Sequence, residues 1–103
     1  MSFTGNEDHT ISLQDASAWT AAYRAANPQA TKGHFFGKAA IEAILNQTGC
    51  VGIRLYYAID TKGQKQIIVV GANANEDDLV NGLLAERSKP CPPYCGTNNA
   101  LNS

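Results

Sequence analysis

The chain has 103 residues and a mass of 11.0 kDa, which is the size of a single domain. Eight basic and nine acidic side chains give a net charge of −1, which argues against electrostatic capture of nucleic acid. No apolar run approaches the roughly 20 residues that span a bilayer, and the polar, acidic N-terminus lacks a secretion signal. We therefore expect a cytoplasmic protein with no nucleic-acid or membrane partner.

The composition predicts a thin core. Valine, isoleucine, leucine and phenylalanine together supply 21 residues, close to the roughly 20% below which chains tend to stay disordered. The small net charge nevertheless favours folding. A chain of this length buries only about 60–65% of its unfolded surface, so a protein partner or a second copy would add stability.

Residues 1–10 are expected to form an N-terminal arm, and a first helix is predicted over about 13–26. Ser12 is a good N-cap residue, and Asp15 follows it three positions later. Apolar side chains then recur every three or four residues, at Leu13, Ala16, Trp19, Tyr23 and Ala26. The helix should end at Asn27, because the residue before a proline avoids the helical region.

A second helix is predicted to open at His34-Phe35-Phe36 and to end before Gly49. Its apolar face would contain Phe36, Ala40, Ile41, Ile44 and Leu45. Successive helical side chains diverge by about 100°, so Phe35 and Phe36 cannot both point inward. One of the two is therefore a candidate contact residue.

The clearest strand pattern covers residues 50–60, where large apolar side chains alternate with smaller or polar ones. The odd positions Val51, Ile53, Leu55, Tyr57 and Ile59 are expected to form its core face. A turn at 60–63 leads into a return strand over 64–72. The continuous apolar run at 67–70 in that strand indicates burial on both faces.

A third helix is predicted from the Asn75 cap to Lys89-Pro90, with Leu79, Val80, Leu83 and Leu84 on its buried face. Residues 91–103 are expected to be an irregular tail because of their prolines and asparagines. The predicted fold class is α+β, with three helices packed on an antiparallel β-hairpin. The order is helix, helix, strand, strand, helix, irregular tail, in one domain over 1–103.

Two motifs carry a resemblance to a known group of proteins. They are Gly49-Cys50-Val51-Gly52-Ile53-Arg54 followed by Tyr56-Tyr57, and Cys91-Pro92-Pro93-Tyr94-Cys95-Gly96. With these motifs the chain resembles, over most of its length, a group of small bacterial proteins of unassigned function. The resemblance implies a bacterial origin and a domain of this size, and it implies no activity.

The three cysteines cannot form a complete disulfide framework within one chain, because their number is odd. Cys91 and Cys95 would lie roughly 13 Å apart in an extended chain, so a disulfide between them needs a turn through the prolines. Three interpretations stay open for this tail. They are a redox dithiol, a metal site completed by Cys50, His34 or His9, and a rigid segment that docks Tyr94.

Two charged groups are further candidates for a site. Arg54 is the one charge in the first strand, and it either binds a ligand carboxylate or serves as a structural cation over Tyr56. The Glu76-Asp77-Asp78 cluster is more typical of a helix start than of a divalent-ion site. The sequence contains neither a phosphate-binding loop nor a hydrolase nucleophile elbow. We therefore expect no catalytic residues, cofactor or metal, and the sequence favours a protein that is not an enzyme.

The leading functional hypothesis is a non-enzymatic protein-interaction or self-assembly module, either a homo-oligomer or bound to a protein partner. A two-stranded sheet is marginal in water, and the hairpin offers free edges and surplus apolar surface. The candidate interface residues are Phe35, Phe36, Tyr56, Ile68, Val70 and Tyr94. The alternative is a thiol-based redox or metal-binding protein that uses Cys91 and Cys95. A small-ligand pocket around Trp19, Arg54 and Tyr56 is a third possibility.

Overall fold

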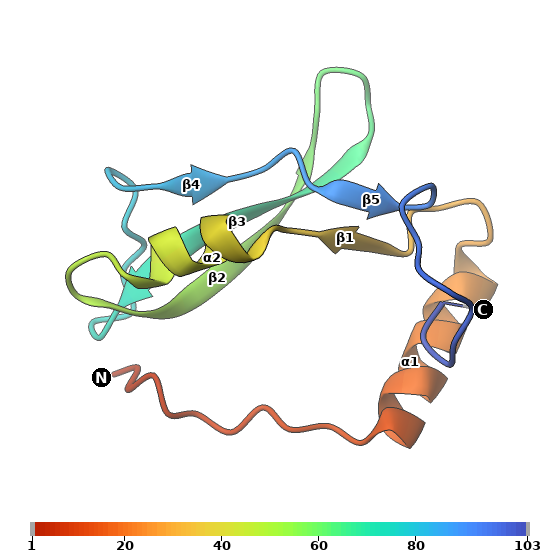
Figure 1. Ribbon diagram of the computed structural model, residues 1–103, viewed down its shortest axis with the longest axis horizontal. Coiled ribbons are helices and arrows are strands. Elements are labelled where there is room, and N and C mark those ends of the chain that lie inside the picture. Colours follow the sequence, from red (N-terminus) through yellow and green to blue (C-terminus); the bar gives the residue numbers. More distant parts are fainter. Residues whose placement is uncertain (1, 103) are drawn as a thin grey trace. The chain divides into compact units, whose positions relative to one another are not determined.

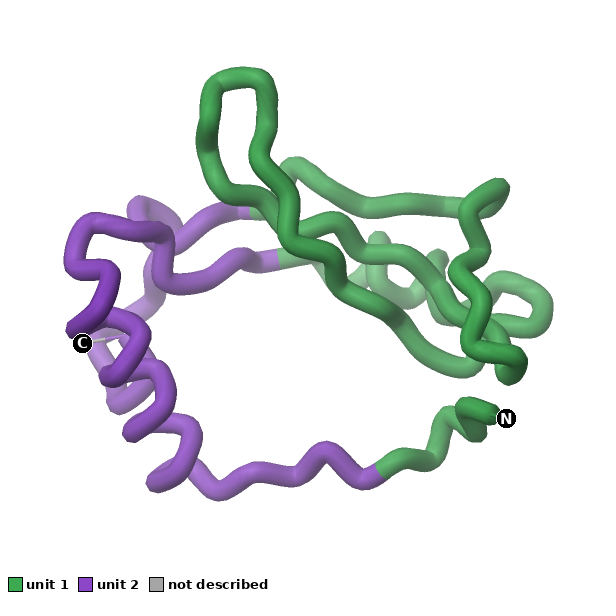
Figure 2. Tube along the Cα trace, turned by 180° about the vertical axis from the view of Figure 1, so that it is seen from behind, with its two compact units in different colours: residues 1–7, 36–88 green, residues 8–35, 89–103 purple. Residues whose placement is uncertain are grey.

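The computed structural model describes residues 2–102, which form two compact units (Figure 2). The sheet unit comprises residues 1–7 and 36–88, and the tail unit comprises residues 8–35 and 89–103. In the described residues each unit contains one helix and one antiparallel sheet. The class is α+β, as expected, but the prediction of three helices on a hairpin is wrong.

The sheet unit is built on the predicted hairpin. Strands β2 (Cys50–Ile59) and β3 (Lys65–Asn73) pair antiparallel along almost their whole length (Figure 1). The short strand β4 (Leu84–Ala85) pairs antiparallel with the other side of β3. The order β2-β3-β4 therefore makes β3 the central strand and leaves β2 at an edge.

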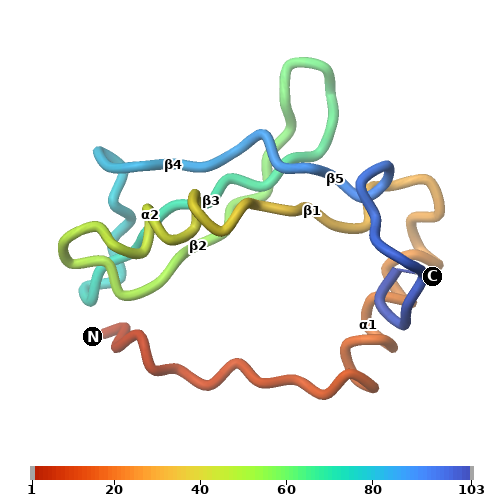
Figure 3. The backbone as a smooth tube through the Cα atoms, in the orientation of Figure 1, coloured from red at the N-terminus to blue at the C-terminus, as the bar shows by residue number. Residues whose placement is uncertain are grey.

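The hairpin turn forms where the sequence predicts it. The Asp60 carboxylate accepts a hydrogen bond of 2.9 Å from the backbone N–H of Gln64. Gly63 takes a φ of 79°, a left-handed conformation that glycine adopts at little cost. The turn projects beyond α2 and β4, so this end of the hairpin extends past the other elements of its unit (Figure 3).

Helix α2 (Lys38–Leu45) covers part of this sheet and contacts all three strands. Ile44 is its buried residue, with 2% of its surface exposed. The start of β2, which follows the helix, packs closely against β3, because a Cβ at Gly71 of β3 would lie 2.9 Å from Cys50 Sγ. The fully buried apolar residues of the described chain are Ile44, Val69, Val70 and Ala72.

The predicted third helix is absent, and residues 74–83 form a loop that leads into β4. Asn73, not Asn75, organises its start, because the Asn73 side chain accepts hydrogen bonds from the backbone N–H of Asn75 and Asp77. Glu76 has a φ of 72°, which no α-helix contains. The backbone N–H of Leu79 then donates to Gly71 O at 2.9 Å, so the segment bonds to the sheet instead of to itself.

The prediction that the odd-numbered side chains of β2 face the core is also wrong. The odd-numbered side chains are exposed to 40% at Ile53, 56% at Leu55, 94% at Tyr57 and 73% at Ile59. The alternation is real, but the eight-residue helix α2 spans only about 12 Å, whereas ten strand residues span about 33 Å. The buried apolar surface lies instead on β3, where Val69 and Val70 are buried and Ile67 and Ile68 are half-buried.

The tail unit contains α1 (Leu13–Ala26), which matches the predicted bounds. The Ser12 hydroxyl caps it by accepting a hydrogen bond of 3.0 Å from the Asp15 N–H. The apolar stripe of α1 is largely exposed, with 69% of the Trp19 surface accessible. In the described part of the chain neither α1 nor α2 is long and apolar enough to cross a membrane.

Two short strands complete the tail unit. Strand β1 (Gly33–Phe35) pairs antiparallel with β5 (Lys89–Cys91), so His34 and Phe35 open no helix and Cys91 is not part of an irregular tail. Pro90 is tolerated because a two-stranded sheet consists only of edges. The residues after β5 bond to the side chains of α1 and its following loop. Ser17 Oγ donates to Ala100 O at 3.1 Å, and Arg24 donates to Leu101 O at 2.6 Å.

Candidate interaction surface

Strand β2 presents two chemically different faces, because successive side chains alternate across a sheet. The odd-numbered side chains form what we call the β2 apolar face, which consists of Ile53, Leu55, Tyr57 and Ile59. The even-numbered face carries Arg54 and Tyr56. The odd-numbered face is apolar and exposed, whereas the even-numbered face binds the 74–83 loop.

A charged cluster on the even-numbered face joins β2 to the 74–83 loop. Arg54 donates to Asp78 Oδ1 at 2.5 Å and to Glu76 O at 3.1 Å. The Tyr56 hydroxyl donates to the other oxygen of Asp78. The Phe3 ring centroid lies 5.4 Å from the Arg54 guanidinium carbon, so this ring is within cation–π distance of the arginine. A ligand carboxylate at Arg54 would have to compete with Asp78.

The hydrogen bonds of this cluster change how its groups titrate. The Tyr56 hydroxyl, followed by the Arg54 guanidinium, holds the pKa of Asp78 below its ordinary value. The hydrogen bond to Asp78 raises the pKa of Tyr56, and it also raises the pKa of Arg54. The cluster is therefore most stable with Asp78 ionised, Arg54 charged and Tyr56 protonated.

Acidification should weaken this cluster, and Asp78→Asn should remove part of the acid sensitivity. The pKa of Asp78 is lower in the folded chain, so its stabilisation is fully present above its unfolded value of about 4. It is lost as the pH falls through the lowered folded value. Urea denaturation at pH 7 and pH 3 measures this. We expect the wild type to lose more stability than Asp78→Asn over this interval.

The matched control is Asp77→Asn, which removes the neighbouring exposed carboxylate and keeps Asp78. This variant should retain the pH dependence of the wild type. Equal pH dependence in Asp78→Asn and the wild type would show that the cluster does not stabilise the folded chain.

The disulfide is the principal chemical feature of the tail unit. Cys91 and Cys95 are linked, with their Cα atoms 4.8 Å apart. The Lys89 ammonium lies 5.0 Å from the centroid of the Tyr94 ring, and Tyr94 is 59% exposed. In the sheet unit the free thiol of Cys50 donates to Gly52 O at 3.1 Å.

Two observations concern the interpretation that Cys91 and Cys95 belong to a metal site. The described residues contain no group of three or more histidine, cysteine, aspartate or glutamate side chains that could hold a metal ion. Sulfurs linked to each other are not thiolate ligands. His34 is half-buried in β1, and this burial lowers its pKa.

The predicted interface residues differ in exposure. Phe35 is 62% exposed in the tail unit, whereas Phe36 is half-buried in the sheet unit. Tyr56 is 46% exposed and is held by Asp78. Ile68 is half-buried, and Val70 is 2% exposed, so Val70 already has its cover. The three most exposed apolar side chains of the hairpin, at Tyr57, Ile59 and Leu55, belong instead to the face that the alternation predicts to be the core face.

Gln47 is a structural residue that sequence reasoning missed. Its amide nitrogen donates to Ile44 O and its carbonyl oxygen accepts from Leu83 N–H, both at 2.8 Å. A Cβ at Gly82 would lie 2.1 Å from this oxygen, so a larger residue there would displace the Gln47 amide from its present position. No local sequence pattern indicates this bridge, because Gln47 and Leu83 are 36 residues apart along the chain.

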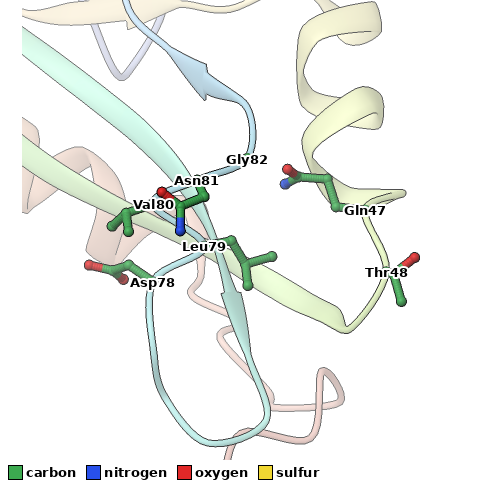
Figure 4. A pocket seen from close by; sticks show the side chains of 7 residues that line it. All are labelled: Gln47, Thr48, Asp78, Leu79, Val80, Asn81 and Gly82. Atoms are coloured by element: carbon green, nitrogen blue, oxygen red, sulfur yellow. The ribbon is translucent and has the colours of Figure 1, made fainter.

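A hollow of about 320 Å³ lies beside this bridge (Figure 4). Asp78 is its one ionisable lining residue, and that carboxylate is held by Arg54 and Tyr56. The hollow therefore presents no pair of free acid and base groups. Its lining residues are Gln47, Thr48, Asp78, Leu79, Val80, Asn81 and Gly82.

Comparison with known proteins adds no relative to this description. No protein-family model, no curated protein and no solved structure matches the chain.

Proposed function

We propose that the chain is a non-enzymatic interaction module that assembles with itself through the β2 apolar face. The observation that supports this proposal is the exposure of four large side chains on one face of one strand, from 40% at Ile53 to 94% at Tyr57. Single exposed apolar residues are normal on a protein surface, but contiguous ones are typical of contact sites.

The energetics favour weak association that depends on concentration. Fully burying one large apolar side chain contributes about 1.5–3 kcal/mol. Loss of translational and rotational freedom costs roughly 4–15 kcal/mol. Each copy contributes Ile53, Leu55, Tyr57 and Ile59. The free energy gained by burying these side chains from two copies exceeds the lower part of the estimated cost of association.

The proposal includes the cellular location, the source and the kind of partner that the sequence indicates. The chain would be a cytoplasmic bacterial protein whose partner is protein and not nucleic acid, because its net charge of −1 gives no basic attraction for phosphates. In the cytoplasm thiols are kept largely reduced, so Cys91 and Cys95 would exchange between the linked and the dithiol form.

The linked pair Cys91–Cys95 favours a second candidate, a thiol-based redox protein. A dithiol reductant would transfer two electrons and two protons to this disulfide, which yields two thiols here and a disulfide in the reductant. Thiol titration discriminates the two candidates. A redox protein should show a reactive thiol of low pKa after reduction, and Cys91→Ser should abolish it and leave the fold intact.

Sedimentation velocity over a wide range of concentration tests the leading proposal. The average mass should rise above 11.0 kDa as the concentration enters the high micromolar range. Tyr57→Lys should shift this rise to at least tenfold higher concentration, because it places a charge at a side chain that is 94% exposed.

Val80→Lys is the matched control, because Val80 is an apolar loop residue of the same unit with 66% of its surface exposed. It should associate like the wild type. A mass of 11.0 kDa at every concentration would contradict self-assembly.

A further inference from the structure

The outer edge of β2 lacks a neighbouring strand in the described chain. The strand order is β2-β3-β4, and β2 continues for ten residues. An edge strand exposes a row of backbone N–H and C=O groups that pair readily with another strand. Natural edges are usually protected by lysine, proline or inward-pointing charges, and residues 53–59 contain none of these except Arg54. Arg54 lies on the even-numbered face, where it is bound to Asp78.

The hydrogen bonds establish which backbone groups point outward. The N–H of Asp60 donates to Gln64 O at 2.9 Å, so even-numbered residues of β2 direct their backbone toward β3. Gly71, which is opposite Ile53, gives its carbonyl to Leu79 on the other side of β3. Both observations agree. The residues whose N–H and C=O groups face the free edge are therefore Ile53, Leu55, Tyr57 and Ile59.

We propose that the edge of β2 pairs antiparallel with β2 of a second copy of this chain, about a two-fold axis at Tyr56. This inference rests on the proposed function and names the partner and the geometry. In an antiparallel pair only residues that both point outward exchange hydrogen bonds. The register that uses all four outward residues places Leu55 opposite Tyr57 of the partner subunit, and Ile53 opposite Ile59 of the partner subunit.

The charges and side chains are compatible with this register. Side chains opposite each other lie on the same face, so Tyr57 of each copy packs beside Leu55 of the partner subunit, and the β2 apolar faces of the two copies partly cover each other. On the other face Tyr56 meets its own symmetry mate, and Arg54 lies opposite Ala58 of the partner subunit. No like charges are therefore opposed, and a net charge of −1 per copy opposes association only weakly.

The ends of the edge limit slippage. A β-bulge between Cys50 and Gly52 interrupts the strand at one end, and the turn begins at Asp60 at the other end. A second copy supplies an edge strand of the same length and apolar pattern, with the same backbone groups facing outward. This self-complementarity is the reason for choosing a second copy over an unrelated extended peptide.

Cysteine cross-linking tests the position of the two-fold axis. Tyr56 would form a non-hydrogen-bonded pair with its mate, with Cα atoms about 4.5 Å apart, which a disulfide can span. In a Cys50→Ala background, Tyr56→Cys should form a covalent dimer under mild oxidation. The control Ile59→Cys, at a side chain that is 73% exposed, should cross-link at least tenfold more slowly because its mate is far from it in this register.

Amide hydrogen exchange on the wild type provides a second test that needs no substitution. Exchange at Ile53, Leu55, Tyr57 and Ile59 should slow at least tenfold between dilute and concentrated protein. The even-numbered amides of β2, which already face β3, should change little.

The outcomes separate the two proposals. If the protein assembles while the outward amides remain fast, the sheets pack face to face and the edge inference is wrong, although the proposed function stands. Equal cross-linking of Ile59→Cys and Tyr56→Cys also contradicts the register. If the protein is monomeric at every concentration, both proposals fail. Slow outward amides in dilute monomer would show that the edge is covered within one chain, which contradicts the inference.

Discussion

Replacing Ile44 with alanine should lower the free energy of unfolding of the sheet unit by about 2–5 kcal/mol. Ile44 lies on α2 with 2% of its surface exposed, and the helix contacts all three strands. The substitution removes the apolar contacts of a buried side chain and leaves a cavity in its place. Such a loss is a large fraction of the about 5–15 kcal/mol by which small domains are stable. Urea denaturation followed by circular dichroism measures it.

The matched control is Ile59→Ala, which makes the same chemical change at a residue with 73% of its surface exposed. At dilute concentration it should change the free energy of unfolding by no more than about 0.5 kcal/mol. If Ile59→Ala costs as much as Ile44→Ala, the odd-numbered face of β2 is buried. The core would then lie where the alternation alone places it.

Reduction of the Cys91–Cys95 disulfide should destabilise the tail unit by about 2 kcal/mol, because the bond closes a loop of only five residues. The effect should be local. The N–H of Lys32 donates to Cys91 O at 2.6 Å, so its hydrogen exchange should accelerate by at least tenfold after reduction with dithiothreitol. Exchange at the buried Val70 of the sheet unit should not change.

The double variant Cys91→Ser/Cys95→Ser serves as the control for this experiment. Its Lys32 amide should exchange quickly in the presence and absence of dithiothreitol. A slow Lys32 amide in the reduced wild type would show that β1 and β5 are held together by their backbone pairing without the disulfide.

Elements with complete local signals could be predicted from the sequence. Helix α1 has a capping serine, periodic apolar residues and a proline stop, and it runs from Leu13 to Ala26 as expected. The hairpin also follows from alternation and from the turn at Asp60 and Gly63. In each case the decisive interactions lie within a few residues of one another along the chain.

Elements that depend on distant contacts could not be predicted in this way. The 75–89 segment has a helical apolar pattern, but Arg54 and Tyr56 bind the Asp78 carboxylate that was expected in the first helical turn. Alternation also shows that β2 has two faces without showing which is covered. Coverage depends on the length of α2, which ends at Leu45.

The candidate site was predicted in part. The sequence indicated surplus apolar surface on the hairpin and a special role for Arg54 beside Tyr56. It did not indicate Asp78 as their shared partner, because the two elements are separated by more than 20 residues. It placed the contact surface at Tyr56, Ile68 and Val70, whereas the larger exposed fractions are at Tyr57 and Ile59.

Oxidative footprinting of Tyr57 tests the central claim most directly, namely that the β2 apolar face is exposed in one copy and covered by association. Tyr57 is 94% exposed, and Trp19 on α1, at 69%, serves as the internal reference. We predict rapid labelling of Tyr57 in dilute protein and at least fivefold slower labelling at high micromolar concentration, with Trp19 unchanged. Slow labelling of Tyr57 in dilute protein, or equal labelling at all concentrations, would contradict the account.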